Sequence, residues 1–164
     1  MTSIDADSAD SLDAAVWDAD APERVVDVLY SLISGPAGEA PRWDRFRALF
    51  APGARLMPTN READGGRVMR VHDVEDYIQA YGAHLREHGF YEMQVAHRVE
   101  RFGRIAHVWS TYTSHVSPEA EAFARGINSI QLYHDGRRWW VVTIFWDSER
   151  DDNPIPPQYL SSST

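Results

Sequence analysis

The chain has 164 residues, of which 43% are apolar and 25% charged, as is typical of one globular domain with a sizeable core. Its net charge of −9 argues against a nucleic-acid partner, and the lack of cysteine excludes disulfides, thiolate catalysis and cysteine-ligated zinc. The sequence has no apolar run of membrane-spanning length and no signal-peptide layout, so we expect a cytoplasmic protein without a membrane partner.

The first twenty residues differ in composition from the rest of the chain. Six aspartates crowd this segment, and few apolar side chains accompany them. Such a composition offers little apolar surface to bury, so residues 1–20 are predicted to form a loose or weakly helical acidic arm. No linker or repeat divides the remainder, and we expect a single domain over residues 21–160.

Apolar residues at helical spacing predict three helices in the first half of the chain. The first begins at Pro22, the second follows Pro41, and the third begins after Asp73, a good N-cap. A glycine or a glycine–proline pair ends each of them. The three apolar faces comprise Val25, Val26, Leu29, Leu32 and Ile33, then Trp43, Phe46, Leu49 and Phe50, and finally Val74, Tyr77, Ile78, Tyr81 and Leu85.

The remaining periodicity is that of strands. Two short strands are predicted between the second and third helices, joined by a turn at Asp64-Gly65-Gly66. After the third helix the apolar period falls to two, with turn signals at Phe102-Gly103 and Asp135-Gly136. The two short strands cover residues 54–59 and 67–71, and four long ones cover 91–101, 104–115, 126–134 and 138–147. Strands this long must coil or bend, so we predict an α+β fold in which the helices close the concave side of a bent antiparallel sheet.

Several segments carry a resemblance to a known superfamily. They are Trp43-Asp44-Arg45-Phe46, Leu49–Pro52, Gly89–Glu92, Phe102–Ala106, Arg125–Leu132, Trp139-Trp140, Trp146–Glu149 and Asn153–Pro156. In these segments and in the order of its elements, the chain resembles the nuclear transport factor 2-like superfamily and, within it, the SnoaL-like proteins. The resemblance implies a cone-shaped roll with three N-terminal helices on a strongly curved, mixed or antiparallel sheet. That cone hosts isomerases, cyclases, epoxide hydrolases, dehydratases, dioxygenase small subunits and binding modules, so function must be argued from the site.

The two faces of the first long hairpin differ in polarity. Pairing centred on Phe102-Gly103 places His107 opposite Arg98, on a polar face that also carries Glu92. Periodicity alone would direct the other, more apolar face toward the helices. The resemblance instead implies that positions an odd number after Ala106 point into the cone. We follow the resemblance and expect the polar face to line a pocket.

Aromatic residues make up 12% of the chain, including six Trp, and such rings often line an apolar cavity. The predicted pocket combines them with polar side chains, which suits a small, partly apolar ligand. Its ligand-binding residues are Arg98, Trp109, Thr111 and Thr113 from the long strands, Ser129 and Gln131 (or alternatively Asn128) and Trp146 from later strands, and Trp43, Tyr77 and Tyr81 from the helices.

Glu92, His107 and Asp44 are the candidate catalytic residues. A carboxylate beside His107 in an apolar cone would have a raised pKa, as a general base requires. Structural roles remain open for both acids, because Asp44 lies in the first turn of a helix and Glu92 could pair with Arg98. The chain is therefore either an enzyme for isomerisation, dehydration or hydrolysis of a small metabolite, or a non-catalytic binding or dimerisation module.

Other kinds of site find little support. His84 and His88 have metal-ligand spacing on the third helix but flank exposed charges, so a solvated face is the better interpretation. No nucleophile elbow or phosphate-binding glycine loop is present, and we expect no cofactor and no metal. Trp139 and Trp140 must face opposite sides of their strand, and an outward Trp favours a homodimer formed through the outer sheet face.

Overall fold

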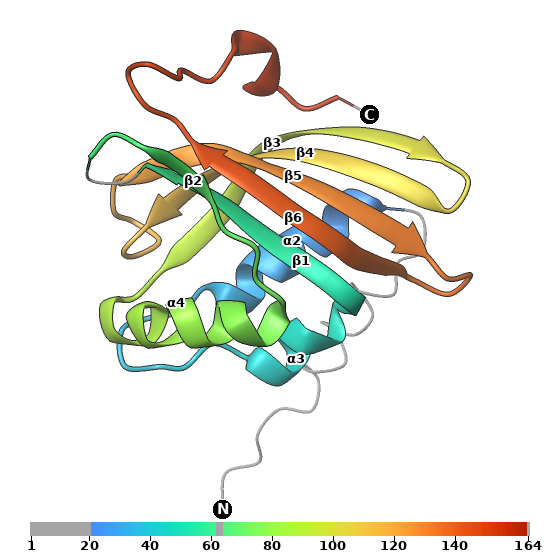
Figure 1. Ribbon diagram of the computed structural model, residues 1–164, viewed down its shortest axis with the longest axis horizontal. Helices are drawn as coiled ribbons and strands as arrows, with labels where there is room; N and C mark the ends of the chain where they lie inside the picture. Colours follow the sequence, from blue (N-terminus) through green and yellow to red (C-terminus); the bar gives the residue numbers. More distant parts are fainter. Residues whose placement is uncertain (1–20, 62–63, 164) are drawn as a thin grey trace, which may run out of the picture.

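The structure, a computed structural model, describes residues 21–61 and 64–163 (Figure 1). The predicted acidic arm, residues 1–20, lies outside the described residues. The predicted helices and strands are present in the predicted order. They are α2 (Pro22–Ile33), α3 (Trp43–Ala48), β1 (Phe50–Arg61), β2 (Arg67–Met69), α4 (Val74–His88), β3 (Tyr91–Phe102), β4 (Ile105–His115), β5 (Ala124–His134) and β6 (Trp139–Ser148). A 3-10 turn that the sequence does not predict, η1 (Pro157–Tyr159), follows them.

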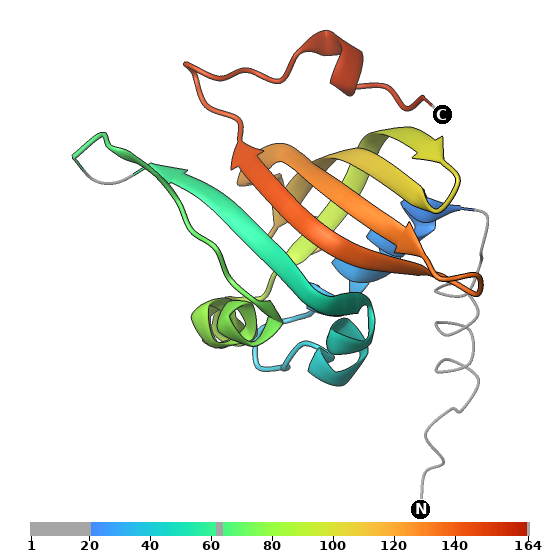
Figure 2. The ribbon, with the colours of Figure 1, turned by 45° about the vertical axis from the view of Figure 1, so that its right-hand side comes forward.

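The six strands form one mixed sheet in the order β2-β1-β6-β5-β4-β3. Neighbours pair antiparallel except β1 and β6, which run parallel although α4 and strands β2 to β5 lie between them in sequence. Figure 1 shows the helices on one side of this sheet and the C-terminal segment on the other. Figure 2 shows how strongly the long strands twist and curve, so that one face is concave toward the helices. This is the predicted α+β cone.

Helix α2 supplies much of the core. Its predicted apolar face is buried against the sheet, with Val26 fully enclosed and Leu29 and Leu32 nearly so. Each such side chain contributes about 1.5–3 kcal/mol when fully buried. Pro22 occupies the first turn, where its missing N–H costs nothing.

Helix α4 is fixed at both ends and along one face. Asp73 and Asp76 form a capping box, because each side chain accepts a hydrogen bond from the other residue's backbone N–H. Gly82 faces the indole of Trp43, and a Cβ at this position would lie 3.3 Å from the ring. The glycine therefore lets α4 lie directly against α3.

The register of the β3–β4 hairpin differs from the prediction by two residues, because the turn is centred one residue later in the chain. Phe102 pairs with Ile105, so the turn consists of Gly103 and Arg104. Gly103 takes the first turn position with a φ of 55°, which glycine adopts without the strain that other residues incur. His107 consequently lies opposite Glu100 instead of Arg98.

A β-bulge at Val95 interrupts the same hairpin. Gln94 pairs with Tyr112 and Ala96 with Thr111, so Val95 is an extra residue without a partner on β4. Side chains alternate between the two faces of the sheet along a strand. One extra residue therefore moves every earlier side chain of β3 to the opposite face from the one it would otherwise occupy. This single irregularity determines where Glu92 lies.

Candidate active site

The concave face of β4 is its apolar one. Ala106, Val108 and Tyr112 are buried in the core shared with α2, whereas His107 and Trp109 point to the outer face. Periodicity alone predicts this orientation correctly, and the orientation taken from the resemblance is wrong. The physical reason is that the helices present a largely apolar surface for β4 to cover, with the Tyr30 hydroxyl as a polar group that contacts Ser110.

Glu92 nevertheless lies inside the cone. It pairs with Ser114, which shares the concave face with Tyr112, because the bulge at Val95 has exchanged the faces of β3. Arg98 lies beyond the bulge and is exposed on the outer side. The predicted cluster of Glu92, Arg98 and His107 is therefore wrong, since the sheet separates Glu92 from the other two.

A cavity of about 250 Å³ lies between the concave face and helices α2 and α4. Aromatic side chains dominate its walls, and Glu92 and Asn128 are prominent among its few polar groups. Its lining includes Tyr30, Phe46, Tyr77, Tyr81, Phe90, Glu92, Tyr112, Ser114, Phe123, Asn128 and Trp146. Glu92 remains partly accessible because its side chain borders this cavity.

A chain of hydrogen bonds holds the Glu92 carboxyl group. Asn128 Nδ2 donates to Glu92 Oε1 over 3.1 Å and to the hydroxyl of Tyr30 over 2.7 Å. That hydroxyl is in turn 2.8 Å from Ser110 Oγ. The backbone N–H of Glu92 donates to Ser34 Oγ over 3.0 Å, just beyond the end of α2. The side chain of Glu92 is thus positioned by the buried Asn128, and its backbone by the half-buried Ser34.

The electrostatics of this carboxyl group depend on the loss of water. Burial raises the pKa of Glu92 to about 7, and the hydrogen bond from Asn128 opposes part of that rise. Burial also raises the pKa of Tyr30, Tyr77 and Tyr112, and the nearby Glu92 raises each further. These phenols therefore stay neutral at physiological pH and remain hydrogen-bond donors.

Three predicted binding residues lie at this cavity. Tyr77 and Tyr81 are stacked at a tilt, with their ring centroids 4.8 Å apart, and Trp146 meets Tyr77 edge-on at 6.4 Å. Phe46 covers the other side of Tyr77 at 5.5 Å. Aromatic groups from α3, α4 and β6 thus form one continuous apolar wall facing the polar corner at Glu92.

The other helical candidates lie elsewhere. Asp44 is fully exposed and forms an ion pair with Arg47 at 3.1 Å, so its predicted place in the cone is wrong. This is the structural role that its position in the first turn of a helix allows. Trp43 packs edge-on against Phe46 and fills the space beside Gly82, outside the residues that line the cavity.

The remaining strand candidates lie on the outer face, so their predicted place inside the cone is also wrong. His107 Nε2 is 2.9 Å from Ser129 Oγ, and the His107 ring meets Trp109 edge-on at 5.8 Å. Thr111 donates to the carbonyl of Tyr159 at 2.6 Å. Two further contacts join Thr113 to His115 and Gln131 to Thr143.

Two residues of the hydrogen-bond chain at Glu92, Asn128 and Tyr30, are not among the main predicted site residues. The sequence offers Asn128 as the alternative to Ser129 and Gln131, and the register of β5 on β4 places Asn128 on the concave face. Tyr30 stands four residues after Val26 and three before Ile33, so the helical spacing of α2 already placed it on the buried face. Its hydroxyl on an otherwise aliphatic face was the available signal.

Within the described ranges, no three histidine or acidic residues gather as metal ligands would. His84 and His88 stack with ring centroids 4.3 Å apart, and both are exposed on α4, where His84 also borders the Glu92 cavity. None of the described helices is both long enough and apolar enough to cross a membrane.

The sequence matches no protein-family model, and a search of curated proteins found no significant match. Solved structures do match. A protein of unknown function with a cystatin-like fold from Nostoc punctiforme has a TM-score of 0.59 and 11% identity, over 79% of this chain and 89% of the other. An NTF-2 like protein of unknown function from Silicibacter pomeroyi has a TM-score of 0.54 and 12% identity, over 86% and 98%.

Two further structural neighbours carry functional names. The CaMKII hub of S. rosetta has a TM-score of 0.59 and 15% identity, over 80% of this chain and 97% of the hub. A protein from Novosphingobium aromaticivorans, provisionally named a scytalone dehydratase, has a TM-score of 0.59 and 11% identity, over 79% and 83%. Identities this low establish architecture alone. The chain therefore has the NTF2-like fold.

Proposed function

We propose that the protein is an enzyme that transfers a proton on a small, partly apolar metabolite, with Glu92 as the acid–base group. The observation that carries the proposal is the Glu92 carboxyl group, which borders an aromatic cavity with a pKa of about 7. A general acid–base group works best when its pKa lies near the working pH, because both protonation states are then populated.

The hydrogen-bonded neighbours suit this role. Asn128 holds one carboxylate oxygen, which fixes the orientation of Glu92 toward the cavity. Isomerisation and dehydration both begin when a base removes a proton from carbon next to an electron-withdrawing group. The provisional name of the Novosphingobium neighbour is compatible with dehydration.

The cavity also limits the substrate. Its volume is about 250 Å³, whereas an apolar cavity of about 150 Å³ holds one benzene ring. A compound with one or two rings is therefore the appropriate size. The aromatic wall and the single carboxyl group favour a neutral substrate, since an anion would be repelled by ionised Glu92.

Hydrogen–deuterium exchange tests the proposal without knowledge of the product. Small cyclic ketones are incubated with the protein in D₂O, and NMR follows the loss of protons next to the carbonyl group. We expect catalysed exchange with the unaltered chain and a loss of roughly a hundredfold or more in Glu92→Gln, because the amide cannot accept the proton.

Glu100→Gln is the matched control, since Glu100 is an exposed glutamate on the same strand. Its exchange rate should equal that of the unaltered protein. Catalysis by an enzyme would be refuted if no ketone in the panel exchanged faster than in buffer, and the role of Glu92 would be refuted by full activity in Glu92→Gln.

A second function, homodimerisation, draws on a separate observation. Four large side chains lie side by side in one row across the outer face, joined by the pairs Phe102–Ile105, Ile105–Tyr133 and Tyr133–Trp140. Phe102 is 84% exposed, Ile105 61% and Tyr133 41%. A contiguous apolar row on a sheet face suits a symmetric contact with a second copy. The name of the neighbour from S. rosetta, a hub, is compatible with assembly in that protein.

A further inference from the structure

The outer face of the sheet holds a second cavity, under the C-terminal segment. We call residues 149–163 the C-terminal strap. In Figure 2 the strap leaves the end of β6 and returns across the sheet on the side opposite the helices. Between strap and sheet lies a cavity of about 410 Å³.

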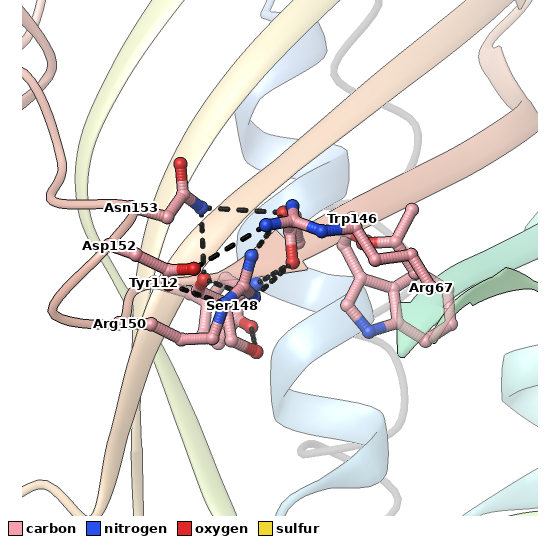
Figure 3. A network of polar contacts seen from close by, with 9 residues as sticks. Arg67, Tyr112, Trp146, Ser148, Arg150, Asp152 and Asn153 are labelled. Carbon is pink, nitrogen blue, oxygen red and sulfur yellow. Dashed lines mark hydrogen bonds and ion pairs between the residues drawn. The ribbon is translucent and has the colours of Figure 1, made fainter. Parts of the chain in front are cut away.

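The near end of the strap is held by a network of ion pairs (Figure 3). Arg150 makes two contacts to Asp147, at 2.6 and 3.1 Å. Arg125 likewise donates two hydrogen bonds to the Glu149 carboxylate, at 2.6 and 3.0 Å. Glu149 also accepts a hydrogen bond from the backbone N–H of Ile155. Such bidentate pairs fix geometry as well as distance.

The far end is attached to the edge of the sheet. Ser163 N donates to the carbonyl of His97 over 2.7 Å, and the carbonyl of Ser163 accepts from Val99 N over 3.1 Å. In between, the carbonyl of Tyr159 accepts from Thr111 Oγ1 over 2.6 Å. Because both ends are fixed to the sheet, the strap forms an arch over the cavity.

Rings and aliphatic groups form most of the cavity wall. Trp109 and Phe145 contribute from the sheet, while Pro154, Pro156 and Tyr159 contribute from the strap. Prolines have a fixed φ, so the strap is stiff at Pro154 and Pro156. They also lack a backbone N–H, so neither residue needs a hydrogen-bond acceptor for its backbone nitrogen. The volume falls within the roughly 300–1,000 Å³ that is usual for small-molecule sites.

The polar groups of the wall indicate the charge of the occupant. The two acidic residues that line the cavity, Asp147 and Glu149, are each neutralised by an arginine. A charged ligand would therefore find no unpaired counter-charge among these acids. The indole Nε1–H of Trp109 is buried without a hydrogen-bond acceptor in the described part of the chain. A buried donor of this kind favours a ligand that brings an acceptor.

We propose that the strap cavity binds a neutral, flat, largely apolar molecule with a hydrogen-bond acceptor, in the class of aromatic ketones and ethers. Its rings lie among Trp109, Tyr159 and Phe145, and its acceptor takes the Trp109 N–H. The sheet separates this site from the Glu92 cavity, with Trp146 bordering both. The proposal is independent of catalysis at Glu92.

Binding of 1-indanone and 1-tetralone, followed by protein NMR at millimolar ligand, tests the site. We expect shifts of the Trp109 indole N–H and of strap residues in the unaltered chain. Trp109→Phe keeps the ring surface but removes the donor, so affinity should fall by about tenfold, the value of one hydrogen bond. Glu92→Gln should leave shifts at these strap-site resonances unchanged.

Two occluding variants are designed to fill the cavity with a larger side chain. Ile155→Trp does so from the strap and Ser129→Leu from the sheet. Either should abolish the shifts, and its amide spectrum shows whether it is folded. 1-Naphthoate, which has a similar ring system and a negative charge, should bind at least tenfold more weakly than 1-tetralone. The proposal is overturned if neither ketone shifts Trp109, if folded occluding variants still bind, or if naphthoate binds equally well.

Discussion

At the scale of single residues, Glu92 gives the protein a characteristic dependence on pH. Its pKa is 4.5 as an ordinary glutamate and about 7 in the folded protein. A raised folded pKa means that the native state binds the proton more tightly than the unfolded chain does. The resulting stabilisation is complete below about pH 4.5 and is lost as the pH rises through 7.

Replacing the ionisable group should remove this dependence. We expect Glu92→Gln to be more stable than the unaltered protein at about pH 8, by up to about 3 kcal/mol, and close to it at about pH 4.5. Urea unfolding at the two pH values measures the difference. Glu100→Gln, the exposed control, should have the free energy of unfolding of the unaltered protein at both pH values. If Glu92→Gln and Glu100→Gln lost equal stability between the two pH values, the raised pKa would not belong to Glu92.

Asn128 tunes the same carboxyl group through its hydrogen bond. Asn128→Leu keeps a similar volume but removes the donor, so the pKa of Glu92 should rise further above 7. Carbon-13 NMR of the glutamate carboxyl groups measures this shift directly. Gln131→Leu, at an exposed position on the outer face of the same strand, is the control and should leave the titration of Glu92 unchanged. A lowered pKa in Asn128→Leu would show that the amide does not stabilise the ionised form.

At the scale of elements, the β3–β4 turn depends on Gly103. Its φ of 55° is unfavourable for residues with a Cβ, although the surrounding space is open. Gly103→Ala should therefore cost about 1–2 kcal/mol from backbone strain alone. Gly35→Ala is the matched control, since that glycine has equally open surroundings and no positive φ.

Thermal unfolding distinguishes the two glycine variants. Gly35→Ala should melt at the temperature of the unaltered protein or slightly above it, because alanine restricts the unfolded chain. Gly103→Ala should melt several degrees lower. Equal melting temperatures would mean that the turn accommodates alanine by another conformation, and that Gly103 does not set the hairpin register.

The bulge at Val95 is the element-scale feature that places Glu92 at the candidate site. Without it, alternation along β3 would place Glu92 on the outer face with Arg98. With it, one strand delivers a carboxyl group to the cone and an arginine to the outer side. The bulge thus separates two groups that a regular hairpin would bring together.

At the scale of the whole molecule, the outer face is divided between two features. The strap covers the end near Thr111 and Asp147, whereas the row from Phe102 to Trp140 lies open at the other end. Burial of that row against a second copy would cover its exposed rings. The proposed dimer and the strap cavity can therefore coexist on one sheet face.

Charge inserted into the open row tests the dimer. Ile105→Glu should convert a dimer to a monomer, because a symmetric contact brings two copies of the introduced carboxylate toward the same interface. Sedimentation velocity measures the mass of each variant. Met69→Glu, an exposed apolar position on β2, is the control and should sediment like the unaltered protein. A monomeric unaltered chain, or a dimeric Ile105→Glu, would contradict this interface.

The sequence by itself determined the helices and the strands, because each rests on the spacing of nearby apolar residues, and the expectation of a cone came from the length of the strands and the family resemblance. It also identified Glu92, Tyr77, Tyr81 and Trp146, whose side chains meet at one cavity. Local spacing carries such information because alternation and helical period act over a few residues.

Only the tertiary structure decided which groups share a face. The one-residue bulge at Val95 cannot be read from a pattern of period two, yet it moves Glu92 to the opposite side from His107. The strap cavity likewise depends on contacts between the C-terminus and strands far from it in sequence, such as Ser163 with His97. Long-range contacts of this kind follow from the packing of the whole chain, which local periodicity does not encode.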